Sequence, residues 1–264
     1  MKATVFLGGG RITGALLAGL RLAKYRPPLL VYDRHPSKLR QLKRLYCVGI
    51  EHDLHRAVAQ SRLLIIAVRP SSVAGLLREI GHFDHPLAAV SLAAGVPLAN
   101  LRAQLGPPVR WARAMPSPLC RSCRGLTGLT FDRHFPANAQ QEVQQLFAAV
   151  GLILEIPERQ MDAFTVTYSA SHGYHALATL VAAAEKLGLD QPTAMTAATH
   201  ALADAIAVCR ESRVSLTALL HEASTPGGTA AAVMEAMDRH GYRRAVSKGL
   251  AAGLKRTRKN AKRN

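Results

Sequence analysis

The chain opens with an apolar run that leads through glycines into a helical pattern, and this stretch restricts the fold more than any other. Val5–Leu7 is typical of a buried strand, Gly8–Gly10 of a turn, and Arg11–Leu17 of a helix start. In dinucleotide-binding folds, the first glycine permits a tight turn and the second lets the backbone approach the pyrophosphate, which faces the helix N-terminus. We therefore expect a nicotinamide dinucleotide at Gly8–Thr13.

A second strand and an acidic residue support this interpretation. Leu29–Tyr32 is apolar, and Asp33 follows it at about the distance at which an acidic side chain meets the adenosine ribose. Thr13 stands where the fingerprint usually has its third glycine. Asp33 favours an unmodified ribose, whereas Arg34 and Lys38 beside it favour a 2′-phosphate. Because positive charge outnumbers the single carboxylate, we favour NADP over NAD.

Strands and helices continue to alternate up to Pro157. Such alternation predicts an α/β, doubly wound parallel sheet that binds its ligand across the carboxyl ends of the strands. Two turns, Arg69-Pro70 and Ala93-Ala94-Gly95, then fall on the cofactor side. Residues 1–157 are expected to form this dinucleotide-binding (Rossmann) domain. The expected strands after the first two cover residues 48–50, 63–68, 87–92, 109–114 and 152–156.

The chain becomes alanine-rich after residue 157 and has few strand formers. Residues 158–254 are therefore predicted to form an all-α domain for substrate binding and dimerisation. About a hundred residues cannot cover the apolar faces of these helices within one chain. We therefore expect a homodimer, or a higher oligomer built on dimers, formed through residues 164–209. The expected helices cover residues 164–187, 192–209, 216–223, 230–240 and 243–254.

The chain of 264 residues carries a formal net charge of +17, and much of it lies at the end. Residues 255–264 contain six basic side chains and no acid, which predicts a disordered tail. We favour a solvated tail over one that contacts nucleic acid. The longest apolar stretch, residues 63–68, is too short to span a bilayer, so we expect a soluble cytoplasmic protein without membrane contact.

The four cysteines are too few and too scattered for a disulfide framework. Cys120 and Cys123 have C-x-x-C spacing, but no second pair completes a zinc site, so we expect no metal. Arginines beside the pair would lower the thiol pKa values. We nevertheless favour incidental thiols over redox chemistry.

Six motifs occur in one order along nearly the whole chain, and in this the chain resembles the pyrroline-5-carboxylate reductase family. The resemblance implies transfer of hydride from a nicotinamide cofactor to the C=N bond of a cyclic imine, in a dimer with an interlocking helical domain. The motifs are Phe6-Leu7-Gly8-Gly9-Gly10, Ala67-Val68-Arg69-Pro70, Ser91-Leu92-Ala93-Ala94-Gly95-Val96, Arg113-Ala114-Met115-Pro116, Gly125-Leu126-Thr127 and Thr225-Pro226-Gly227-Gly228-Thr229.

The residue types and the resemblance together imply two sets of binding residues. The substrate carboxylate is expected on the turn Thr225–Thr229, where proline lies just inside a helix start, threonine caps it, and glycine N–H groups form an anion pocket. The cofactor set is Gly8, Gly10, Arg11, Ile12, Thr13, Asp33, Arg34, Lys38, Ala67, Val68, Arg69, Pro70, Ala93 and Met115, with the nicotinamide near the last two. The substrate set is Ser117, Tyr174, Thr225, Gly227, Gly228 and Thr229.

Three departures from the family pattern surround the expected substrate pocket. Ser117 replaces an asparagine, and residues 168–173 differ throughout from the family's S-G-S-G-P-A. Ala230 replaces a threonine that, as the resemblance implies, hydrogen-bonds the substrate nitrogen. The proton must then come from solvent, from a substrate that enters as its iminium, or from Ser171, His172 or Thr229. Two alternatives stay open: a reductase of a different imine or keto acid, and a cofactor-binding regulatory protein without turnover.

Overall fold

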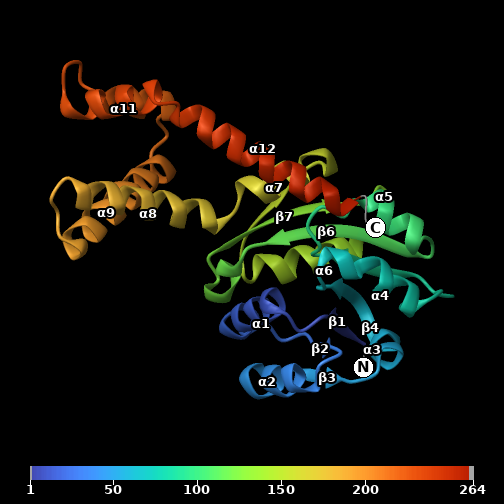
Figure 1. Ribbon diagram of the computed structural model, residues 1–264. Coiled ribbons are helices and arrows are strands. Elements are labelled where there is room, and N and C mark those ends of the chain that lie inside the picture. Colours follow the sequence, from blue (N-terminus) through green and yellow to red (C-terminus); the bar gives the residue numbers. More distant parts are fainter. Residues whose placement is uncertain (1, 262–264) are drawn as a thin grey trace. The chain divides into compact units, whose positions relative to one another are not determined.

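The structure is a computed structural model that describes residues 2–261. Strands that alternate with helices come first in the chain, and a set of helices alone follows them (Figure 1). The strands are β1 (Ala3–Leu7), β2 (Leu29–Tyr32), β3 (Gly49–Glu51), β4 (Ser61–Ile66), β5 (Leu87–Ser91), β6 (Val109–Pro116), β7 (Gly125–Phe131) and β8 (Gly151–Glu155). The helices between them are α1 (Arg11–Leu22), α2 (Pro36–Tyr46), α3 (Leu54–Ala59), η1 (Pro70–Ser72), α4 (Val73–Ile80), α5 (Leu98–Gln104), η2 (Pro118–Ser122) and α6 (Ala137–Ala148).

The eight strands form one sheet in the order β3-β2-β1-β4-β5-β6-β7-β8. Only the β6–β7 pair is antiparallel among these neighbours. The chain leaves β1 toward one edge of the sheet and returns at β4 to build the other, so the order reverses between β1 and β4. This is the switch point at which doubly wound sheets bind their ligands, and the predicted fold class is confirmed.

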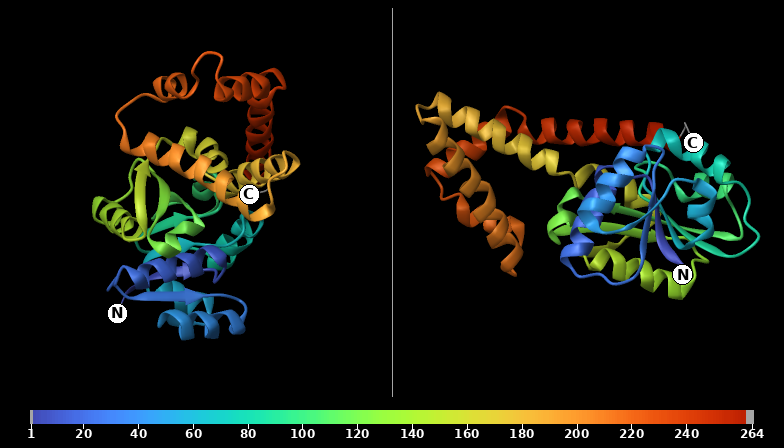
Figure 2. Two further views of the ribbon diagram at one scale, coloured as in Figure 1. Left: turned by 90° about the vertical axis from the view of Figure 1, so that its left-hand side faces the viewer. Right: turned by 90° about the horizontal axis from the view of Figure 1, so that it is seen from below.

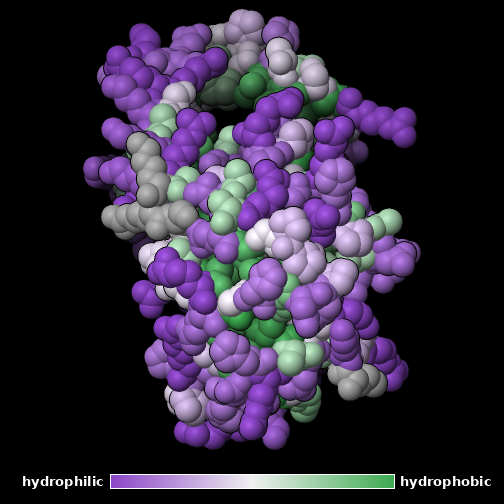
Figure 3. Space-filling model, turned by 90° about the vertical axis from the view of Figure 1, so that its right-hand side faces the viewer, coloured by the Kyte–Doolittle hydropathy of each residue, from purple (hydrophilic) through white to green (hydrophobic). Residues whose placement is uncertain are grey.

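Side chains alternate between the two faces of the sheet and pack against different helices. Leu64 and Ile66 of β4 belong to a core with α3, α4 and α5, while Leu63 and Ile65 belong to a core with α1, α2 and α6. Strands buried on both faces explain the continuous apolar runs in the sequence. Figure 2 shows the sheet with helices on both sides. The side of the molecule drawn in Figure 3 is mainly hydrophilic, with hydrophobic atoms visible between the hydrophilic ones.

The remaining helices are α7 (Glu158–Thr167), α8 (Ala170–Lys186), α9 (Gln191–Glu211), α10 (Leu216–Ala223), α11 (Thr229–Arg239) and α12 (Tyr242–Ala261). They divide between two compact units, because the first unit runs to Tyr168 and resumes at Ala252, and the second covers Ser169–Ala251. The sequence had placed this boundary after residue 157. Helix α7 belongs to the first unit since Phe164 packs directly over Gly128 of β7, where an added Cβ would lie 2.6 Å from the ring.

Several predicted elements need correction. The helix expected over residues 164–187 is two helices, which are interrupted where Tyr168 ends α7 and Ser169 caps α8. The tail expected to be disordered is helical as far as Ala261, and residues 262–264 lie outside the described part. The sequence-based prediction also lacked α3, α5 and β7. Helices α3 and α5 are too short to show a clear helical repeat of apolar residues.

No helix within residues 2–261 is long and apolar enough to cross a membrane.

Candidate functional site

The turn after β1 depends on glycine at its first position. Gly8 has φ +114°, and a Cβ there would lie 2.6 Å from the carbonyl oxygen of Ala67 at the end of β4. Its N–H donates to the Tyr32 carbonyl at 2.8 Å. The backbones of β1, β2 and β4 therefore meet around Gly8 without room for a side chain.

The next part of the turn faces open space. Gly10 is the N-cap of α1, and a Cβ built on it would meet nothing within 4 Å. The first N–H of the helix that bonds a helical carbonyl is that of Gly14, which donates to Gly10 at 3.0 Å. The N–H groups of the first turn are therefore directed out of the helix end, where a phosphate would be stabilised.

The Thr13 side chain stabilises the glycine turn from within the protein. Its side chain is fully buried, and its Oγ1 donates to the Gly8 carbonyl at 2.5 Å. The side chain therefore braces the glycine turn from behind, and only its backbone N–H can face a ligand. This explains why a threonine can stand where the fingerprint usually has glycine.

Asp33 is held mainly by the protein's own backbone. Its Oδ2 accepts from the Gly9 N–H at 2.8 Å, and its Oδ1 accepts from the His35 N–H at 2.9 Å and lies 2.8 Å from the His35 ring. Burial alone raises the pKa of the Asp33 carboxyl, but the two backbone hydrogen bonds, the His35 ring and the Lys38 ammonium together outweigh burial and hold the pKa below its ordinary value. The carboxylate is thus charged and engaged before any ribose arrives.

A cleft of about 530 Å³ lies between the ends of β1, β2 and β4. Its lining includes four side chains that carry or can carry positive charge, of which Arg34 is paired with Glu79 and Lys38 lies 3.7 Å from Asp33. Predicted residues in this lining are Gly8, Gly10, Asp33, Arg34, Lys38, Ala67, Val68 and Arg69. The sequence-based prediction missed Leu7, Tyr32, His35, Ser71, Ser72, Gly75 and Leu76, although Leu7 and His35 adjoin predicted residues and the two serines follow Pro70.

Arg11 and Ile12 line a neighbouring hollow of about 800 Å³, which shares Gly10, Lys38 and Ala67–Arg69 with the cleft. Pro70, Ala93 and Met115 line neither space, although these three also stand at the carboxyl ends of strands. Ala93 and Met115 are buried. The structure therefore gathers the residues expected at the pyrophosphate and adenosine, and it leaves those expected at the nicotinamide beneath the surface.

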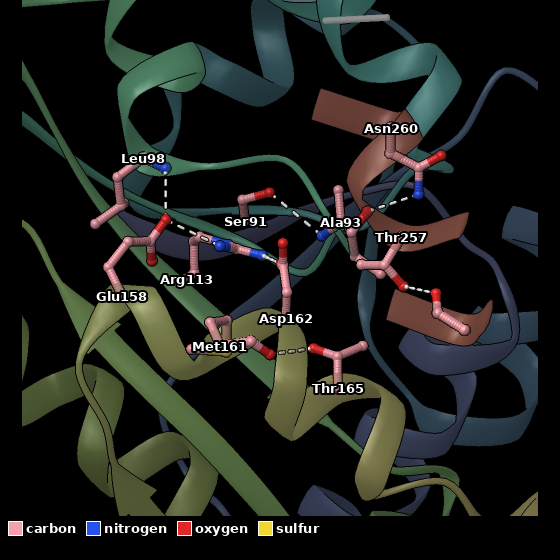
Figure 4. Close-up of polar contacts among 12 residues, drawn as sticks. Ser91, Ala93, Leu98, Arg113, Glu158, Met161, Asp162, Thr165, Thr257 and Asn260 are labelled. Atoms are coloured by element: carbon pink, nitrogen blue, oxygen red, sulfur yellow. Dashed lines mark hydrogen bonds and ion pairs between the residues drawn. The ribbon is translucent and has the colours of Figure 1, made fainter. Parts of the chain in front are cut away.

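An ion cluster surrounds the buried Arg113, whose strand position pairs with Ser91 of β5 (Figure 4). Arg113 of β6 is 1% exposed, and its guanidinium lies 2.9 Å from Glu158 and 3.3 Å from Asp162, both on α7. Glu158 also accepts the N–H of Leu98 at the start of α5, at 3.0 Å. One arginine thereby joins β6, α7 and the N-terminus of α5 at the carboxyl edge of the sheet.

Except for Ser117, the remaining predicted site residues lie in the second unit. Ser171, His172 and Tyr174 lie in the first turns of α8 and are exposed, and the Ser171 hydroxyl is 2.6 Å from that of Ser169. The sequence predicted these residues inside one long helix, whereas the structure places them at the start of α8. Their chemical roles stay predictions.

The turn at Thr225–Thr229 differs from the expected helix start. Gly228, not Thr225, is the N-cap of α11, and Pro226 precedes the helix. The Gly228 N–H donates to the Thr225 carbonyl at 2.9 Å, and Gly227 has φ +75°, so these residues form a β-turn with proline second and glycine third. The Gly228 N–H is thus used within the turn, and the first N–H groups of α11 remain as the available donors.

The pKa of Cys120 departs from the lowering that its neighbouring arginines had suggested. Cys120 is fully buried, and burial raises the pKa of its thiol to about 11. The flanking arginines do not make this thiol reactive, because the loss of hydration dominates.

Comparison with known proteins bears directly on this site. Residues 158–260 match the family model for pyrroline-5-carboxylate reductase dimerisation, and residues 4–95 match that for NADP oxidoreductase, coenzyme F420-dependent. The pyrroline-5-carboxylate reductase of Mycobacterium tuberculosis is 30% identical over 97% of this chain and 96% of its own length. The chain belongs to the pyrroline-5-carboxylate reductase family. The enzyme of Corynebacterium melassecola is 29% identical over 96% of both chains.

Solved structures of the family share the fold. The pyrroline-5-carboxylate reductase of Coxiella burnetii superposes with a TM-score of 0.86 at 24% identity over 98% of both chains. The Plasmodium falciparum pyrroline carboxylate reductase, solved with NADP bound, gives 0.86 at 18% identity over 98% of both chains.

Two departures from the family pattern meet in this structure. The Tyr168 hydroxyl donates to Ser117 Oγ at 3.0 Å and accepts the Leu126 N–H at 2.8 Å, while Ser117 also accepts the Leu119 N–H at 3.2 Å. In the family pattern that the sequence resembles, asparagine stands at position 117 and serine at position 168. The larger tyrosine thus bonds the smaller serine, and Ser117 is buried and engaged within the protein.

Proposed function

We propose that this protein reduces 1-pyrroline-5-carboxylate to L-proline, with NADPH as the donor. The observation that carries the proposal is the nearly full-length similarity to reductases of this name. The chain is an NAD(P)-dependent oxidoreductase acting on a CH–NH bond. The open space at Gly10, the helix end behind it and the basic cleft fit a dinucleotide, and the bound nicotinamide supplies the hydride.

Three features of the cleft support NADPH over NADH. Both oxygens of Asp33 already accept backbone hydrogen bonds, so the carboxylate is less able to bind ribose hydroxyls. Lys38, Arg69 and Ser71 line the same cleft and suit a 2′-phosphate. Side-by-side titrations with NADPH and NADH test this preference, and tighter binding of NADH would contradict it.

The turn Thr225–Thr229 is proposed to hold the substrate carboxylate. Its support is local: free N–H groups begin α11, and the chain is strongly basic. Ala230 cannot donate to the imine nitrogen, so the proton comes from solvent, from a substrate bound as the iminium, or from Thr229, Ser171 or His172. If the iminium is the reactive form, turnover falls as pH rises even in His172→Ala.

We also propose a homodimer built on the second unit. The only buried cluster found among its described residues consists of Val181, Ala194 and Ala198. Large apolar side chains such as Leu187 (88% exposed) and Tyr174 (68% exposed) stand on its surface. Light scattering tests this directly, and a stable monomer at working concentration would contradict it.

The decisive experiment measures NADPH oxidation with 1-pyrroline-5-carboxylate and then with other cyclic imines and keto acids. Turnover on the first substrate supports the proposal. Turnover only on the others favours a reductase of different specificity, for which the Tyr168–Ser117 contact is the specific observation. NADPH binding without any turnover indicates a regulatory protein.

A further inference from the structure

The last helix of the chain contacts the turn that follows β5 (Figure 4). The side-chain amide of Asn260 donates to the Ala94 carbonyl at 3.0 Å. In the other direction, the side-chain amide of Asn100 on α5 donates to the Ala261 carbonyl at 2.7 Å. Two hydrogen bonds thus join residues about 160 positions apart in the sequence, one at the turn itself and one at the helix that follows it.

The backbone of the turn touches the backbone of α12. Gly95 has φ +73°, and a Cβ there would lie 2.1 Å from the Thr257 carbonyl oxygen and 2.9 Å from the Thr257 Cγ2. Thr257 is itself buried. Glycine is therefore required at position 95 for two reasons. Its backbone is in the left-handed region, and α12 lies too close to leave room for a Cβ.

This turn lies where the cofactor cleft would continue across the sheet. The glycine turn follows β1, the cleft reaches Ala67–Arg69 after β4, and β5 is the next strand in the sheet order. The N–H of Leu92 still bonds the end of β4, at Ile66, and the N–H of Ala93 donates to Ser91 Oγ at 3.3 Å. A dinucleotide that has its adenosine at Asp33 and crosses the switch point extends its other half toward this turn.

We propose that Asn260 and Thr257 are positioning residues, which hold the Ala93–Gly95 turn so that it can receive the nicotinamide half of the cofactor. This inference rests on the proposed use of a nicotinamide dinucleotide. The final turns of α12 then belong to the working enzyme and are not a dispensable basic tail.

The test compares Asn260→Ala with Lys259→Ala, a neighbouring exposed residue of the same helix. Dissociation constants are measured for NADPH and for 2′,5′-ADP, which carries the adenosine half alone. Asn260→Ala should weaken NADPH binding about fivefold, the loss expected of one hydrogen bond, and leave 2′,5′-ADP binding unchanged. Lys259→Ala should change neither constant.

A second measurement needs no substitution. Hydrogen–deuterium exchange of the wild-type protein should slow at residues 94–96 and at the end of α12 when NADPH is added, and it should not slow there with 2′,5′-ADP. The proposal is overturned if Asn260→Ala binds both ligands as the wild type does, if it loses both equally, or if exchange at α12 ignores NADPH. These outcomes are independent of whether 1-pyrroline-5-carboxylate is reduced, so failure of the proposed substrate would be recognised separately.

Discussion

Replacement of two neighbouring glycines should separate folding from cofactor binding. In Gly8→Ala, the new Cβ meets the Ala67 carbonyl oxygen at 2.6 Å on a backbone with φ +114°. Strain of this kind and overpacking each cost about 1–3 kcal/mol, so we expect a loss of about 2–6 kcal/mol in the free energy of unfolding. The melting temperature should fall by roughly 5–15 °C.

Gly10→Ala should behave in the opposite way. Gly10 has φ −79°, which alanine adopts freely, and its Cβ would meet no atom within 4 Å. Alanine is a poorer N-cap than glycine, but it also restricts the unfolded chain, so the stability should change by less than about 0.5 kcal/mol. Because the new methyl group would occupy the space proposed for the pyrophosphate, NADPH binding should weaken at least about tenfold, or 1.4 kcal/mol.

Calorimetric titration with NADPH and thermal unfolding of the same preparations provide the two readouts. Gly249→Ala is the matched control, since its Cβ also meets nothing within 4 Å but it lies on α12, outside the residues lining the cleft. It should retain wild-type binding. Unchanged NADPH affinity in folded Gly10→Ala would refute the placement of the pyrophosphate, and wild-type stability in Gly8→Ala would refute the steric argument.

Three further predictions concern ionisable side chains that are buried or hydrogen-bonded within the protein. Arg113→Ala leaves two carboxylates of α7 without their buried partner and should cost about 3 kcal/mol in urea unfolding; a loss below 1 kcal/mol would contradict the role of the cluster. The folded pKa of Asp33 is lowered, so its stabilisation is present above the ordinary carboxyl pKa and disappears as pH falls through the folded value. The difference in unfolding free energy between wild type and Asp33→Asn should therefore shrink below about pH 4, and a constant difference would be inconsistent with this assignment. Finally, iodoacetamide at pH 8 should label exposed Cys47 but label Cys120 only in denaturant, as mass spectrometry of the peptides would show; rapid labelling of Cys120 in the folded protein would disprove its protection.

Local sequence signals were enough to predict the nucleotide-binding half of the molecule. The glycine turn, Asp33 and the apolar strands lie within short segments, and each has a backbone requirement that can be read from the residues themselves. Long-range contacts could not be read in this way. Thr13 matches the position of the fingerprint's third glycine, but the hydrogen bond from its hydroxyl to Gly8 could not be predicted from that match. The departures at Ser117 and Tyr168 looked independent, yet their hydroxyls meet.

The C-terminal segment shows why composition alone can mislead. A run such as residues 255–261 has abundant like charge, which favours disorder in an isolated chain. Its exposed side chains are indeed basic, but Thr257 is buried against Gly95, and Asn260 bonds the Ala94 carbonyl. A helix with one contacting face needs only a few such residues, spaced three apart, and the remaining positions are free to carry charge. Within the basic run, the uncharged residues Thr257 and Asn260 therefore fix the helix against the protein. Their role could be predicted only together with the Ala-Ala-Gly turn that they contact.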